Sequence, residues 1–83
     1  MVTKVKKINN RKIKLLLNKN FYKEEAIKEA IEKFKEICNI YLKKDISSFE
    51  ITLSSNSEHL LEKNIELEFS NYVIVAMKNK LLV

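Results

Sequence analysis

Residues 21–42 constrain the fold more than any other part of this chain. In the first half of this stretch, apolar residues recur at spacings of three and four, which places them on one stripe of a helix: Ala26, Ile27, Ala30, Ile31 and Phe34. Beyond Glu36 the pattern becomes an alternation, in which Cys38, Ile40 and Leu42 point one way and Asn39, Tyr41 and Lys43 the other. The chain is therefore expected to pass directly from a helix into a strand.

Composition limits the kinds of site that the chain can build. Its 83 residues are enough for one small domain of modest stability, and 46% apolar with 33% charged residues is typical of globular proteins. The chain has no glycine and no proline. A glycine-rich phosphate-binding loop is therefore excluded, and asparagine is the best remaining residue for turns.

Three segments have the alternating pattern of strands. Residues 12–17 predict one strand, and residues 38–43 and 49–54 predict an antiparallel hairpin because only a short connection separates them. The hairpin directs Ser48, Glu50, Thr52 and Ser54 away from the expected core. That side of the sheet is expected to face solvent or a partner.

Two helices complete the predicted core. The first is expected to begin at Lys23 or Glu24, with Phe21 packed on its first turn, and the second to begin at Glu58 with Ser57 as its N-cap. The second helix has one apolar stripe at Leu61, Ile65, Phe69, Tyr72, Val73 and Ala76, and another at Leu60, Leu67, Ile74 and Leu81. The second stripe predicts contact with another copy or another protein. Because residues 72–77 are rich in β-branched side chains, a strand remains an alternative there.

The positive charge of the chain is concentrated at its N-terminus. Residues 1–20 contain seven basic residues and no acid, although the whole chain has a net charge of only +5. Residues 1–11 are interpreted as a basic arm, with an edge strand as the alternative. The predicted architecture is α+β, in which residues 12–83 form a single domain in the order β-α-β-β-α with a three-stranded sheet packed against two helices.

The titratable residues do not form a recognisable catalytic constellation. His59 is the only histidine and reads as a surface residue, Cys38 reads as a small core residue, and the glutamates of the first helix alternate with lysines as on a solvated face. One cysteine excludes a disulfide within the chain, and the lysine-rich start does not resemble a signal peptide. The expectation is a cytoplasmic protein with no enzymatic activity, metal, cofactor or membrane span.

The basic N-terminal residues leave nucleic-acid binding as an alternative. Lysines can neutralise phosphates, but the arm has no aromatic residue on which a base could stack. An acidic peptide or protein surface would suit the same charges. The sequence therefore makes nucleic acid the less favoured partner.

Two segments resemble the HxsD family of the His-Xaa-Ser peptide systems. The first segment, FYKEEAIKEAIEKF, matches that family at Tyr22, Glu25, Ala26, Ile27, Ala30 and Phe34; the second, EFSNYVI, matches it at Phe69, Asn71 and Ile74. Order and spacing agree across residues 13–74. Lys23 and Tyr72 differ from the family pattern, in which a serine and an acidic residue occupy these places. A downstream arginine and a further C-terminal helix of the family also have no counterpart here.

The resemblance implies an accessory protein that holds a ribosomally made precursor peptide for a radical SAM enzyme. An exposed sheet edge could accept such a peptide as an added strand. The candidate peptide-binding residues lie on the hairpin: Asn39, Tyr41, Lys43, Glu50 and Thr52. The candidate partner-docking residues lie on the second helix: Leu67, Tyr72, Ile74, Met77 and Leu81. A small homo-oligomeric structural or regulatory protein that dimerises through this helix is the alternative.

Overall fold

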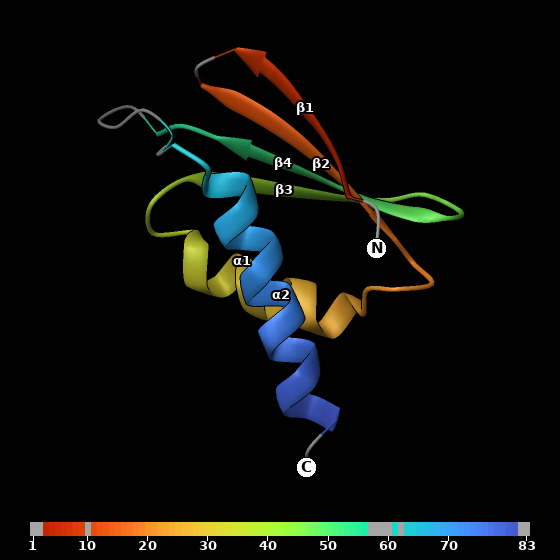
Figure 1. The fold of residues 1–83 in the computed structure, drawn as a ribbon. Coiled ribbons are helices and arrows are strands. Elements are labelled where there is room, and N and C mark those ends of the chain that lie inside the picture. Colours follow the sequence, from red (N-terminus) through yellow and green to blue (C-terminus); the bar gives the residue numbers. More distant parts are fainter. Residues whose placement is uncertain (1–2, 10, 57–60, 62, 82–83) are drawn as a thin grey trace.

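The computed structural model describes residues 3–9, 11–56, 61 and 63–81. Six elements follow one another along the chain (Figure 1): β1 (Thr3–Asn9), β2 (Lys12–Asn18), α1 (Glu24–Phe34), β3 (Asn39–Lys44), β4 (Ser48–Ser54) and α2 (Ile65–Leu81). The class is α+β and the hairpin is confirmed, as the sequence predicts, but residues 35–38 form a short turn between α1 and β3 instead of a direct passage from helix to strand. None of the described helices is long and apolar enough to cross a membrane.

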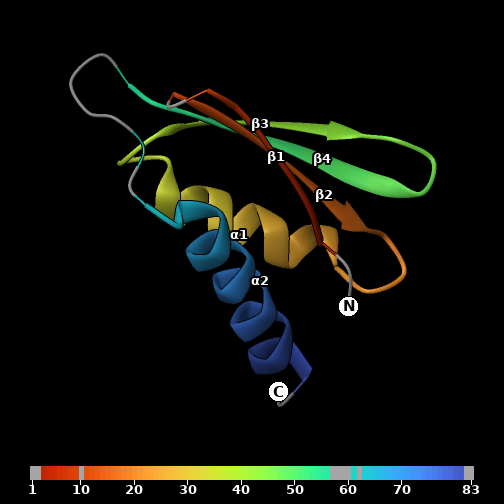
Figure 2. The same ribbon diagram turned by 45° about the horizontal axis from the view of Figure 1, so that its top comes forward.

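The four strands form one antiparallel sheet in the order β1-β2-β4-β3. Both helices lie on the same side of this sheet, and the C-terminal half of α2 extends away from it (Figures 1 and 2). We call the helix-covered side the inner face and the opposite side the outer face. Because β1 and β3 are the edge strands, each has one side on which no described strand pairs with it.

The core lies between the inner face and the two helices. Alternate residues of the central strands are buried there, so that Leu15 and Leu17 of β2 lie opposite Ile51 and Phe49 of β4. Each such side chain contributes about 1.5–3 kcal/mol relative to an exposed position. The helices meet through Phe34, whose ring makes edge contacts with Phe69 at 5.4 Å and with Tyr72 at 5.9 Å between centroids.

Residues 3–9 correct the prediction of a three-stranded sheet and an N-terminal arm. They form β1, which pairs with β2 from Thr3 opposite Leu17 to Asn9 opposite Lys12. The strand carries no clear alternation because it lies at the edge, where Val5 and Ile8 keep 42% and 44% of their surface exposed. Weak burial on both faces removes the pattern by which strands are recognised in a sequence.

The second helix begins later than predicted. The expected start at Ser57 and Glu58 lies outside the described residues, and Lys63 and Asn64 form a turn before α2 begins at Ile65. Asn64 has a φ of 63°, and its carbonyl accepts hydrogen bonds from the amides of Leu67 and Glu68. The region 72–77 is helical, so the strand alternative is excluded there.

The first helix is also anchored differently from the prediction. Phe21, expected to pack on the first turn, is about half exposed, whereas its neighbour Tyr22 is buried in the core. Lys23 provides no side-chain cap, and its backbone N–H donates to Sδ of Met77 at 3.3 Å. The start of α1 is therefore held by α2 rather than by a local hydrophobic contact.

Candidate peptide-binding surface

The five candidate peptide-binding residues lie together on the outer face. In the register of β3 and β4, Tyr41 is opposite Thr52 and Lys43 is opposite Glu50. Asn39 continues the same face of β3 toward Ser54. Tyr41 is 65% exposed, so its ring projects from the sheet. The alternation read from the sequence is what places these side chains on one side.

The charges of this surface are only partly paired. Glu50 lies opposite Lys43, but its carboxylate forms an ion pair with Lys14 of β2, at 3.1 Å. Lys43 has no ion pair with any described residue. An acidic group of a partner could therefore approach Lys43 without displacing an existing contact.

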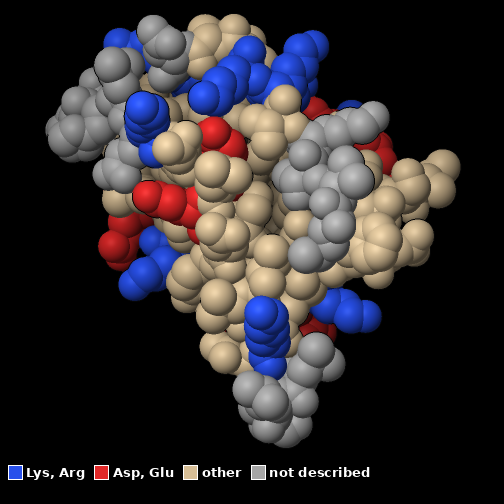
Figure 3. Space-filling model, in the orientation of Figure 1, with Lys and Arg blue, Asp and Glu red and all other residues tan. Residues whose placement is uncertain are grey.

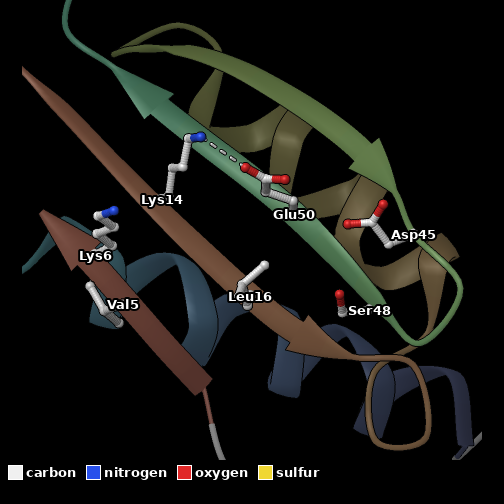
Figure 4. Close-up of a pocket in the computed structure, with 7 residues that line it drawn as sticks. All are labelled: Val5, Lys6, Lys14, Leu16, Asp45, Ser48 and Glu50. Carbon is white, nitrogen blue, oxygen red and sulfur yellow. Dashed lines mark ion pairs between the residues drawn. The ribbon is translucent and has the colours of Figure 1, made fainter. Parts of the chain in front are cut away.

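A groove of about 610 Å³ crosses the outer face beside these residues. Figure 4 shows its lining: Val5 and Lys6 of β1, Lys14 and Leu16 of β2, Asp45 in the turn between β3 and β4, and Ser48 and Glu50 of β4. Lys6 lies at one side of the groove and Asp45 at the other. The sequence interpretation missed the β1 side because those residues were assigned to an arm.

The two edges of the sheet differ in how well they could accept another strand. The β1 edge is rich in lysines, and its pairing with β2 is irregular between Lys7 and Asn9, two features that protect edges from further pairing. The β3 edge pairs regularly with β4 and keeps Ile40 and Leu42 half-buried at the margin of the core. The β3 edge is thus the better acceptor.

An ion pair ties the end of β3 to the first helix. Glu24 accepts from Lys44 at 2.7 Å and from Lys28 at 3.0 Å. The hydrogen bond from Lys44, followed by that from Lys28, lowers the pKa of the Glu24 carboxyl below its ordinary value. Lys44 is therefore engaged on the inner face, whereas Lys43 faces outward.

The candidate docking residues of α2 fall into two groups. Leu67 is 56% exposed, as expected for an outward stripe, whereas Ile74 is half-buried and packs against the core. Val75, which the sequence interpretation did not include, is 53% exposed. Tyr72 and Met77 instead contact α1, through Phe34 and through the amide of Lys23. The side chain of Leu81 lies outside the described residues. The candidate docking surface is thus reduced to Leu67, Ile74 and Val75.

The other candidate chemical groups do not assemble. Cys38 is buried, its thiol donates to the carbonyl of Phe34 at 3.6 Å, and burial raises the thiol pKa. Within the described ranges, no group of three histidine, cysteine or acidic side chains is placed to hold a metal ion. His59 lies outside them.

In comparisons with family models, with curated proteins and with solved structures, no match was found.

Proposed function

We propose that the protein is a non-enzymatic recognition module that binds an extended peptide as an additional strand beside β3. Following the resemblance to the HxsD family, the peptide is a ribosomally made precursor, and the protein presents it to a radical SAM modifying enzyme. The proposal rests mainly on the edge of β3. No described strand pairs with this edge, β3 pairs regularly with β4, and its residues Ile40 and Leu42 are only half-buried at the margin of the core.

Backbone hydrogen bonds would supply most of the affinity. In an antiparallel sheet, alternate residues of an edge strand direct their N–H and C=O groups away from the existing neighbour, where an added strand can pair with them. On the inner face, apolar residues of the peptide would cover the half-buried Ile40 and Leu42. Hydrogen bonds to the peptide replace those that the free edge makes with water. Burial of these two side chains adds a hydrophobic contribution to the affinity.

Side chains on the outer face would supply specificity. Residues of the added strand that point outward would lie next to Asn39, Tyr41 and Lys43, with Thr52 and Glu50 one strand further in. An acidic peptide residue beside Lys43 would meet a cation that lacks a partner among the described residues. The favoured peptide therefore alternates apolar and polar residues and carries an acid on its polar side.

The modifying enzyme would dock on the exposed apolar residues of α2. Leu67, Ile74 and Val75 lie on a helix outside the sheet, so a protein could dock there while β3 remains open. A second copy of the chain at the same surface is the competing interpretation, in which the protein is a small homo-oligomeric structural or regulatory protein.

The test uses synthetic peptides that cover a short ribosomal product encoded beside this chain. The peptide that binds would be made in two N-methylated forms, one methylated at every even amide and the other at every odd amide across the bound segment. An added strand uses only alternate amides, so one form should lose binding and the other should retain it. Isothermal titration would give both affinities, and chemical-shift changes should concentrate in β3.

Equal binding of the two methylated forms would contradict strand addition. Chemical-shift changes confined to α2 would also contradict it. The comparison needs no substitution in the protein, so that a loss of folding cannot be mistaken for a loss of binding.

A further inference from the structure

The outer face carries a pattern of charge that strand addition at β3 does not use. Its side chains form rows that cross the strands, as the pairing registers show. One row runs from Lys12 through Ser54 to Asn39, and the next runs from Lys6 through Lys14 and Thr52 to Tyr41. With strands about 4.8 Å apart, the second row spans roughly 14 Å.

These two rows hold three lysines and no carboxylate. Lys6 is directly opposite Lys14, an arrangement of like charges that destabilises a sheet unless an anion lies near both. Lys14 has one anionic contact, Glu50, which belongs to the next row, and neither Lys6 nor Lys12 has an ion pair among the described residues. Figure 3 shows Lys and Arg side chains gathered at the top of the molecule, over β1 and β2.

We propose that the outer face of the sheet binds single-stranded nucleic acid, with phosphates over Lys6, Lys12 and Lys14 and a base stacked on Tyr41. Asn39, Tyr41 and Thr52 would serve both ligands, but the phosphate contacts at Lys6, Lys12 and Lys14 lie on β1 and β2 and do not depend on peptide binding at the edge of β3. Tyr41 supplies the aromatic surface that the N-terminal segment lacks, and folding brings it into the same row as Lys6 and Lys14.

An acidic protein is a less suitable occupant of this face. The centres of protein interfaces are depleted in lysine, whereas interfaces with nucleic acids are polar and basic throughout. On the two central strands of this face, Lys14 lies beside Thr52, and the next pair is Leu16 beside Glu50. Beside the exposed ring of Tyr41, the amide of Asn39 and the hydroxyl of Thr52 can donate to and accept from base edges. Because only unstacked bases present their faces to an aromatic ring, a single strand is favoured over a duplex.

The test measures fluorescence anisotropy of a labelled oligodeoxythymidine of about 12 nucleotides with the full chain, as salt is varied. Three phosphate contacts predict a slope of log K against log salt near −2, which is a loss of roughly 20-fold between about 50 and 200 mM salt. An unlabelled duplex of the same length should compete less well than the single strand.

Charge variants distinguish binding at this surface from non-specific attraction by the net charge of the chain. Lys6→Gln with Lys12→Gln should weaken binding at low salt at least about tenfold and reduce the slope to about −0.7. The matched pair Lys33→Gln and Lys78→Gln removes the same charge from exposed positions on α1 and α2. We expect little change in affinity for that pair.

Substitutions at Tyr41 test stacking. Tyr41→Ser should lose about fivefold or more in affinity, whereas Tyr41→Phe, which keeps the ring, should bind as the natural chain does. Equal losses in the two lysine pairs, or equal behaviour of the two Tyr41 variants, would overturn the proposal. Tighter binding of a polyglutamate peptide of the same charge would also overturn it and identify an acidic protein as the partner.

Discussion

Glu24 shows how one side chain joins elements that are distant in the sequence. Its carboxylate accepts from Lys28 within the same helix, a pairing visible in the sequence, and from Lys44 at the end of β3, which only the fold brings near. The contact lies on the inner side of the strand to which we assign peptide binding. Its effect is measurable because both lysines lower the pKa of this carboxyl.

We expect Glu24 to titrate below its ordinary value of 4.5. Since its pKa is lower in the folded state than in the unfolded state, its contribution to stability is complete above pH 4.5 and is lost as the pH falls through the folded-state value. Lys44→Gln should raise the Glu24 pKa more than Lys28→Gln, because the bond from Lys44 is the larger cause. NMR titration of the side-chain carboxyl would measure both shifts, and an unchanged value in Lys44→Gln would contradict this contact.

At the scale of elements, β1 changes the role of the N-terminal segment. It covers one side of β2, and Lys7 reaches the buried carboxylate of Glu66 in α2 at 3.7 Å between Nζ and Oε1. Arg11, in the connection to β2, donates its backbone N–H to the side chain of Asn9 at 2.7 Å. An arm would make none of these contacts, so the two interpretations differ in their consequences for stability.

Deletion of residues 1–9 should lower the free energy of unfolding by at least about 2 kcal/mol. The loss follows from several backbone hydrogen bonds to β2, each worth about 0.5–1.5 kcal/mol net, and from the uncovered Glu66. Urea denaturation followed by circular dichroism would measure it. Lys4→Gln with Lys6→Gln is the control, because it removes two charges and leaves the strand in place. An unchanged midpoint after the deletion would favour an arm.

At the scale of the whole molecule, the surfaces proposed for the peptide and for nucleic acid share the outer face of the sheet, whereas the exposed apolar residues of α2 lie on the side of the helices. Both helices cover the inner face of the sheet, and no described helix covers the outer face (Figure 2). The exposed apolar residues of α2 lie outside the core. Leu67 and Val75 are separated by two helical turns, so they offer much less than the roughly 800 Å² per partner that a stable interface usually buries.

We therefore expect a monomer in sedimentation experiments up to high micromolar concentration. Dimerisation that is lost in Leu67→Lys with Val75→Lys would instead support the homo-oligomeric alternative. Ile46→Lys is the matched control, since Ile46 is a fully exposed apolar residue in the turn between β3 and β4. Loss of the dimer in that control would assign the association to exposed apolar surface in general.

The sequence by itself determined the elements that bury one face and leave the other exposed, with buried side chains at regular spacing. Alternation identified β2, β3 and β4, and spacings of three and four identified the buried side of α1, because a side chain that must face the core repeats with the period of its element. The same alternation grouped Asn39, Tyr41 and Lys43 on one face. Absence of glycine indicated that asparagine would serve in turns, but Asn64, which takes the left-handed conformation just before α2, fell inside the helix predicted from the sequence.

Only the tertiary structure decided what lies beside these elements. β1 has little burial and therefore no periodic signal, yet pairing with β2 makes it a strand and places Lys6 opposite Lys14. The order β1-β2-β4-β3 then aligns those lysines with Tyr41 and leaves the edge of β3 open. Contacts between distant segments depend on strand order and register, which local periodicity does not encode. For that reason the hairpin residues of the peptide site could be predicted, whereas the row that joins Lys6 and Lys14 to Tyr41 emerged only from the fold.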